Sequence, residues 1–186
     1  RVAQSARRAC TNKSDQHTHT FISGDGVSSH EQNIEAARTK GHHGIAMTEH
    51  NTNEGVDYCR EKGLIREDGH PVDGFLIIPG VEVTTAEGHL LCIGASLPYL
   101  KGVPAREVCD LIHERGGLAI PPHPYDLFRA GIRFSTLESL PIDALEVFNA
   151  ATHLRRYNRY AFKYAQRRGL PMTRAGDAHH HASDGT

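Results

Sequence analysis

The chain has 186 residues, which is enough for one domain with a proper buried core. Its 21 Lys and Arg residues almost balance its 22 Asp and Glu residues, whereas a general nucleic-acid binder is usually strongly basic. No apolar run approaches the roughly 18 residues of a membrane span, and the first ten residues lack the apolar stretch of a signal peptide. We therefore expect a cytoplasmic protein without membrane association or a stable nucleic-acid complex.

Histidine is unusually common, with 14 residues in a chain that has no Trp. Because histidine is the commonest metal ligand in proteins, this composition suggests metal chemistry. The four cysteines lie far apart and form no CxxC pair. Neither a disulfide framework nor a thiolate zinc site is therefore expected.

Apolar strand-like segments alternate with helical segments along the whole chain, without a repeat or a linker. The predicted strands are a short one leading into His17, then residues 44–48, 75–78, 81–84, 90–93, 118–121, 144–148 and 170–175. The predicted helices cover residues 28–40, 53–62, 104–115 and 151–168. This alternation predicts an α/β fold with a mainly parallel sheet, either a barrel or an open sheet. We assign residues 1–14 to an N-terminal lead-in and residues 15–186 to a single domain.

Nearly every predicted strand is followed by a potential metal ligand. These residues are His17, His19, Glu49, His50, Glu82, His123, Glu146, Asp177 and His179. In a (β/α) barrel the carboxyl ends of all strands converge on one face, whereas an open sheet gathers such residues at a single switch point. The pattern favours a barrel, although 186 residues is short of the roughly 250 that are typical of eight strands.

The first motif is His17-Thr18-His19. Side chains two apart in a strand point to the same side, so both imidazoles can reach one ion. Two polar residues on an exposed strand would give the same pattern. Asp25 follows in a Gly-Asp-Gly turn, where it could be a ligand or an ordinary turn residue.

Glu82 lies inside an apolar strand, where a carboxylate without a partner would be costly, so a metal ion or another cation must offset its charge. Burial of His89 would be less costly, because a hydrogen bond to the backbone can satisfy a core histidine. His123 stands between two prolines, which fix the direction of its imidazole. Imidazoles and carboxylates without a thiolate suit two or three divalent ions such as Zn, Mn or Fe, which could activate a bridging hydroxide.

Several of these motifs together resemble the PHP (polymerase and histidinol phosphatase) family of metal-dependent phosphoesterases, over about residues 15 to 180. They are His17-Thr18-His19, Asp25-Gly26, Thr48-Glu49-His50-Asn51-Thr52, Gly80-Val81-Glu82-Val83, Gly88-His89, Pro122-His123-Pro124, Glu146-Val147-Phe148-Asn149 and Gly176-Asp177-Ala178-His179. The resemblance implies a distorted seven-stranded (β/α) barrel, TIM-like in type, with a trinuclear site.

The resemblance also implies three metal sub-sites. The first comprises His17, His19, Glu82 and Asp177, the second comprises Glu82 as a bridge with His89 and His123, and the third comprises Asp25, His50 and His179. Where the family usually has Asp, this chain has Glu49, for which we expect an acid/base role. Gly24 lengthens the chain segment that leads to Asp25, compared with the family pattern.

The resulting hypothesis is a phosphoesterase that acts on a phosphorylated small molecule or a nucleotide. Arg129 and Arg133 follow His123 on a loop of the expected active face, and either could also be a surface charge. Arg129 is the preferred phosphate-binding residue, because a guanidinium matches phosphate bidentately. Three alternatives remain open: an exonuclease for short oligonucleotides, a non-catalytic PHP module, and an amidohydrolase. Many amidohydrolases use a bridging lysine, and no lysine follows a predicted strand. The oligomeric state is left open.

Overall fold

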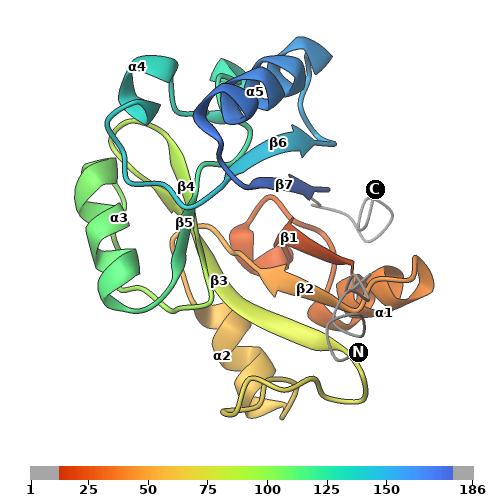
Figure 1. Cartoon of the computed structure of the whole chain (residues 1–186). Helices are drawn as coiled ribbons and strands as arrows, with labels where there is room; N and C mark the ends of the chain where they lie inside the picture. Colours follow the sequence, from red (N-terminus) through yellow and green to blue (C-terminus); the bar gives the residue numbers. More distant parts are fainter. Residues whose placement is uncertain (1–12, 178–186) are drawn as a thin grey trace, which may run out of the picture.

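The computed structural model describes residues 13–177 (Figure 1). Its strands are β1 Ser14–Thr18, β2 Gly44–Met47, β3 Leu76–Thr84, β4 His89–Ile93, β5 Leu118–Ile120, β6 Leu145–Asn149 and β7 Met172–Ala175. Its α-helices are α1 His30–Thr39, α2 Glu54–Glu61, α3 Ala105–Glu114, α4 Phe134–Leu137 and α5 Arg155–Arg168, with 3-10 turns at Phe21–Ser23 and Leu127–Arg129. Local signals place most of these elements as predicted: Ser29 and Gln32 form a capping box at α1, and Gly169 ends α5 in the left-handed conformation.

Five strands form one curled sheet in the order β1-β2-β3-β4-β5, and β6 and β7 form a second. Strand β4 runs antiparallel to both β3 and β5, which corrects the expectation of a mainly parallel sheet in this region. The reason is the connection between β3 and β4, which spans only residues 85–88, since a parallel crossover needs about a dozen residues or more. The reversal pairs His89, the first residue of β4, with Thr84, the last residue of β3.

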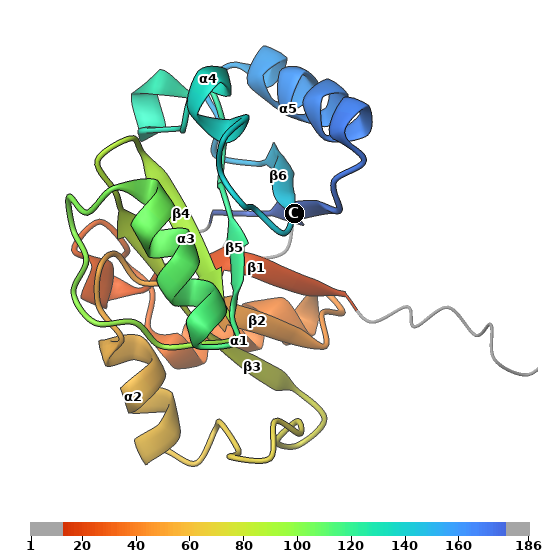
Figure 2. The ribbon, with the colours of Figure 1, turned by 60° about the vertical axis from the view of Figure 1, so that its left-hand side comes forward.

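The expected distorted (β/α)7 barrel is only partly realised in the described residues. Helices do surround the strands, as the turned view shows (Figure 2). Between β5 and β6, however, only isolated backbone hydrogen bonds form, from Asp143 N to Ala119 O (3.0 Å) and from Glu146 N to Pro121 O (3.3 Å). Strand β7 reaches β1 through the backbone N–H of Gly176, which donates to the Asp15 carboxylate. The fold is thus a five-stranded half-barrel with a separate parallel pair.

Apolar side chains fill both sides of the curled sheet. Helices α1 and α2 pack on β2 and β3 around Ile45, Met47 and Ile77, while α3 and α5 pack around Val108, Ile112 and Tyr164. A smaller cluster inside the curl includes Ala46, Leu91, Ile120 and Ala144. This packing fixes the strand positions, so the polar residues near the strand ends are held on a rigid frame.

Within residues 13–177, no helix combines the length and the apolar character that crossing a bilayer requires.

Candidate metal centre

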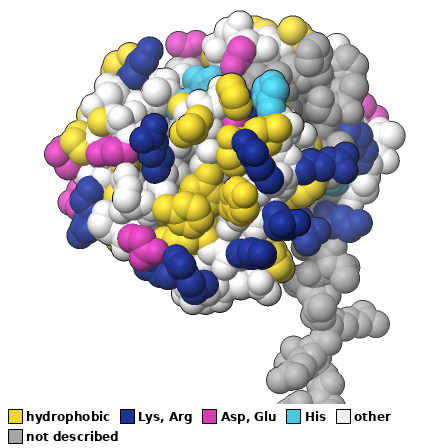
Figure 3. Space-filling view, turned by 90° about the horizontal axis from the view of Figure 1, so that it is seen from above, with side chains coloured by type: hydrophobic (Ala, Val, Ile, Leu, Met, Phe, Trp, Pro, Cys, Tyr) yellow, Lys and Arg dark blue, Asp and Glu magenta, His cyan; other side chains and the backbone are white. Residues whose placement is uncertain are grey.

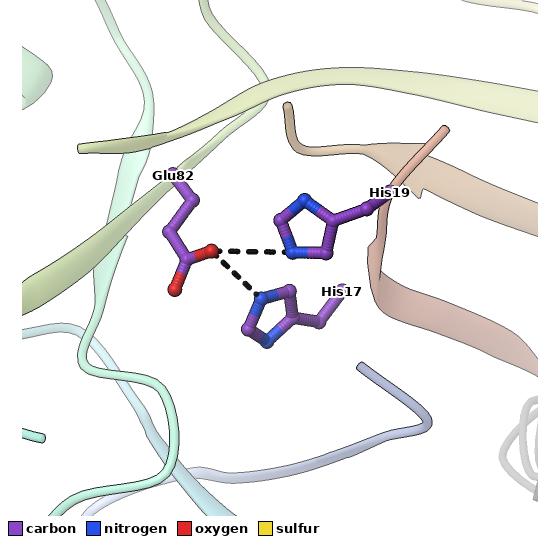
Figure 4. Close-up of side chains that lie close together, drawn as sticks. All are labelled: His17, His19 and Glu82. Carbon is purple, nitrogen blue, oxygen red and sulfur yellow. Dashed lines mark ion pairs between the residues drawn. The ribbon is translucent and has the colours of Figure 1, made fainter. Parts of the chain in front are cut away.

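Glu82 of β3 is the centre of the polar cluster and is 1% exposed. Figure 4 shows His17 and His19 of the β1 segment directed at the same carboxylate oxygen, with each Nε2 atom 3.2 Å from Oε2. Three more imidazoles approach Glu82 at 3.1 Å (His50 Nδ1), 2.8 Å (His89 Nδ1) and 3.3 Å (His123 Nε2). The structure therefore brings together residues that are separated by more than 100 positions in the chain.

Five imidazole nitrogens around one carboxylate cannot all be satisfied by hydrogen bonds to it, because a carboxylate offers about four lone-pair positions. The buried Nε2 atom of His17 makes no hydrogen bond with the described residues. Lone pairs of neutral imidazoles facing Glu82 would also repel its negative charge. Positive charge must therefore lie between these groups, as protons or as metal ions.

The donor set fits divalent cations. Three groups have ligand atoms within 4.8 Å of one another: His17 with His19 and Glu82, His17 with His123 and Asp177, and His50 with Glu82 and His89. Glu82 belongs to two of these groups, which is the arrangement expected of a bridging carboxylate. Imidazole and carboxylate donors are the ligands that suit Zn, Mn or Fe.

Strand pairing positions His50 next to Glu82. The backbone N–H of Glu82 donates to the carbonyl of Glu49 (3.0 Å), and the N–H of Asn51 donates to the carbonyl of Glu82 (2.9 Å). The other ring nitrogen of His50, Nε2, lies 3.4 Å from the carboxylate of Asp25, which is half exposed. The structure thus places Asp25 at the outer edge of the cluster.

Two cluster residues have a left-handed backbone: His123 with φ +31° and Asp177 with φ +51°. Such a conformation costs a non-glycine residue about 1–2 kcal/mol and persists only where the surroundings impose it. At His123 the flanking prolines restrict the backbone, and the His123 N–H donates to Oε2 of Glu146 at 2.6 Å. Strained conformations are common at functional sites, where they aim a side chain.

Glu146 is a site residue that the sequence analysis named at a strand end and in a family motif, without giving it a role. Its Oε1 atom lies 3.2 Å from Nδ1 of His17, and its Oε2 accepts a hydrogen bond from Asn149 Nδ2 at 2.8 Å. The same Asn149 nitrogen donates to Asp177 Oδ2 at 3.0 Å. An ionised carboxylate can only accept, so Nδ1 of His17 must carry the proton that it shares with Glu146. Both residues belong to the motif Glu146-Val147-Phe148-Asn149 of the sequence analysis, which lies within β6.

Charge coupling in the cluster is strong. Burial alone would lower the pKa of His17, but the negative charges of Asp177, Glu82 and Glu146 outweigh it and raise that pKa well above the usual value. Burial likewise opposes ionisation of Glu82 and Asp177, yet the neighbouring imidazoles, His17 foremost, hold both pKa values well below the usual range. The carboxylates are thus kept ionised, and their negative charge favours cations beside them, whether protonated imidazoles or metal ions.

An open pocket of about 420 Å³ leads to the cluster, and its described lining includes Asp25, His50, Glu82, His89, His123, Phe128 and Arg129. The Arg129 guanidinium reaches into the site, with Nη2 at 2.5 Å from Asp177 Oδ2, while its buried Nε makes no hydrogen bond with the described residues. Glu49 is buried and is not part of the described pocket lining. His179 lies outside the described residues.

Comparison with known proteins gives the chain's relatives. The family model described as the PHP domain matches residues 15–160. An uncharacterized protein of Methanocaldococcus jannaschii is 33% identical over 148 residues, which cover 74% of this chain and 82% of the relative. A second uncharacterized protein of that organism is 30% identical over 108 residues, which cover 55% of this chain and 46% of the relative, so the chain spans less than half of its length.

Solved structures share the fold. A protein of Bifidobacterium adolescentis, provisionally assigned as a metal-dependent phosphoesterase, is 17% identical with a TM-score of 0.71, over 92% of this chain and 89% of that one. An amidohydrolase of Chromobacterium violaceum with bound sulfate and no metal is 14% identical with a TM-score of 0.68, over 92% and 89%. Endonuclease Q in complex with an abasic duplex is 19% identical with a TM-score of 0.65, over 90% and 49%. Since its family model covers most of the sequence, the chain belongs to the PHP domain family.

Proposed function

We propose that the chain is a metal-dependent phosphoesterase that hydrolyses a phosphate ester of a small molecule or a nucleotide. The observation that carries this proposal is the Arg129 guanidinium beside Asp177, at the wall of a pocket whose floor is the Glu82 cluster. A phosphate in that pocket would meet a bidentate donor as well as the cations that the cluster attracts. The provisional assignment of the Bifidobacterium adolescentis protein is consistent with this substrate class.

The proposed ligands are those that the family resemblance implies. His17, His19, Glu82 and Asp177 would hold one ion, and Glu82, His89 and His123 would hold a second. Asp25, His50 and His179 would complete a third. When bound, Zn, Mn or Fe ions lower the pKa of water and offset the negative charge that develops on the phosphate. Glu146 and Asn149 hold His17 and Asp177 in place, and Arg129 orients the phosphate oxygens.

The test is hydrolysis by chelator-treated protein before and after reloading with Mn, Zn or Fe, screened against phosphomonoesters and phosphodiesters. We expect no turnover without metal and recovery after reloading. Asp177→Asn should abolish turnover, whereas Asp110→Asn, an exposed carboxylate on α3, should not. Full activity of the metal-free protein would rule out this function, and cleavage of amide substrates alone would favour the amidohydrolase alternative.

A nuclease activity is the second candidate, and one surface feature favours it. Helix α5 has six basic residues and no acidic one. Among the described residues, Arg155, Arg156, Arg159 and Lys163 make no ion pair, and Tyr160 is 43% exposed beside them. Seen from above, basic side chains surround an apolar patch on this side of the molecule (Figure 3). Cleavage of short oligonucleotides with steep salt dependence would support this candidate, although a basic face on a chain of net charge −1 is also an ordinary solvated surface.

A further inference from the structure

The hydroxyl group of Ser23 lies between two of the proposed metal ligands and a buried carboxylate. Its Oγ is 3.0 Å from Nδ1 of His19 and 3.1 Å from the backbone nitrogen of His50. It also makes a short hydrogen bond to Oε2 of Glu49. Ser23 is the last residue of the 3-10 turn that follows β1, so a turn residue contacts both His19 and His50.

The hydrogen-bonding capacity of a hydroxyl group determines the direction of each bond. A hydroxyl donates one hydrogen bond and accepts two. The backbone N–H of His50 can only donate, and the ionised Glu49 can only accept, so the hydroxyl hydrogen goes to Glu49. The remaining lone pair of Ser23 faces His19, whose Nδ1 must therefore carry a proton. With Nδ1 protonated, Nε2, the atom 3.2 Å from Glu82, is the nitrogen left to bind a metal ion.

Glu49 is itself held rigidly. The backbone N–H of Thr20 donates to both of its oxygens at 3.1 Å, and the Thr20 hydroxyl donates to Oε1 at 2.6 Å. The α2 residue Gly55 packs so closely that an added Cβ would lie 2.9 Å from Cγ of Glu49. Both oxygens of Glu49 accept hydrogen bonds and its side chain is buried outside the described pocket lining, so Glu49 is suited to be a fixed acceptor.

We propose that Ser23 and Glu49 are positioning residues for the metal centre. They fix the tautomer and ring orientation of His19 and anchor the backbone of His50, so that one hydroxyl group sets two ligands. This gives Glu49 a role other than the acid/base function expected from its place before His50. Both histidines of the first motif then have an Nδ1 atom that is oriented by a buried carboxylate. For His17 the carboxylate is Glu146, in direct contact, and for His19 it is Glu49, which acts through Ser23. The inference rests on the proposed ligand role of His19.

The first experiment measures metal affinity by competition with a chromophoric chelator, using Zn and Co. Partners that orient a ligating histidine typically contribute about 10–100-fold in metal affinity. We expect Ser23→Ala to lose affinity in that range, and Ser23→Thr, which keeps the hydroxyl, to recover most of it. Ser139→Ala removes a hydroxyl from an exposed turn and should leave affinity unchanged. Wild-type affinity in folded Ser23→Ala would overturn the proposal.

The second experiment reads the tautomer directly in metal-free wild-type protein, by long-range proton–nitrogen correlation at about pH 8, above the usual imidazole pKa. His19→Asn identifies the His19 signals. We expect Nδ1 of His19 to carry a proton in the wild type, and to carry it only part of the time in Ser23→Ala. An unprotonated Nδ1 of His19 in the wild type would overturn the proposal even if the variants failed to fold. Because neither readout uses hydrolysis, a chain that binds metal without cleaving phosphate esters would refute the proposed function and leave this inference standing.

Discussion

One carboxylate, Glu146, supports two proposed ligands at once: its Oε1 lies 3.2 Å from Nδ1 of His17, and its Oε2 accepts the backbone N–H of His123. Replacing it by Ala should leave a buried N–H unsatisfied at a strained residue, which costs about 1–3 kcal/mol of unfolding free energy. The same change frees the His17 ring, so metal affinity should fall about 10–100-fold.

Denaturant unfolding and metal competition titrations on the Glu146→Ala variant check both effects. Glu138→Ala is the matched control, because Glu138 is exposed and its ion pairs with Arg167 and Arg168 are at the surface. Such pairs contribute about 0–1 kcal/mol. If the two variants behaved alike, Glu146 would have no role in the metal centre.

The buried thiols give a prediction that is independent of the metal centre. Burial raises the pKa of Cys92 to about 11 and the pKa values of Cys59 and Cys109 to about 12. Only the thiolate reacts, so these three residues should resist a disulfide reagent at about pH 8 in the folded chain. In a Cys10→Ser background, labelling should appear only with unfolding and should follow the loss of circular dichroism. Rapid labelling of the folded chain would contradict the packing of α2 and α3.

Several features of the site could be read from the sequence, because they depend on local periodicity. His17 and His19 lie two apart on a strand, and Glu82 interrupts an apolar one. These patterns predict the convergence on Glu82 that the structure describes. His123, between two prolines, lies with its Nε2 atom 3.3 Å from Glu82, and its role as a metal ligand stays a prediction.

Other features depend on chain direction and on side-chain packing, which local patterns do not carry. His89 reaches Glu82 because β4 is antiparallel, so the residue begins its strand instead of ending it. The segment around Pro79-Gly80 forms one continuous strand where two were predicted, since Gly80 allows the carbonyl of Cys92 to approach closely. No local pattern marks Ser23 as a site residue, and helix α4, with four residues, is too short to show a helical period.

Glu82 provides the sharpest test of the cluster itself. Glu82→Gln keeps the shape of the side chain but removes its charge, so a carboxylate that bridges two ions should lose occupancy at both sites together. Folding should be retained, because an amide is cheaper to bury than an unpaired carboxylate. Metal analysis of matched wild-type and variant samples measures the stoichiometry. Retention of every ion, or loss of only one, would show that Glu82 is not a bridge.

Arg129 should act on the substrate and not on the metals. Removing a charged hydrogen bond costs about 1.5–3 kcal/mol, so Arg129→Ala should lower kcat/KM for a phosphate ester by roughly 10–100-fold. Arg129→Lys should recover only part of this loss, because an ammonium group cannot make the planar bidentate contact. Arg133→Ala serves as the control, since Arg133 is exposed at the start of α4.

Metal content distinguishes the two ways in which Arg129 could affect activity, by binding the phosphate or by supporting Asp177. The Arg129 guanidinium pairs with Asp177, a proposed ligand, so the arginine supplies positive charge beside the proposed metal site. Removing it should leave metal occupancy equal to that of the wild type or slightly higher, because a competing cation has been taken away. Loss of activity with unchanged metal content would place Arg129 on the phosphate. A parallel loss of metal and activity would make it a structural support of Asp177 instead, and would contradict its proposed role in substrate binding.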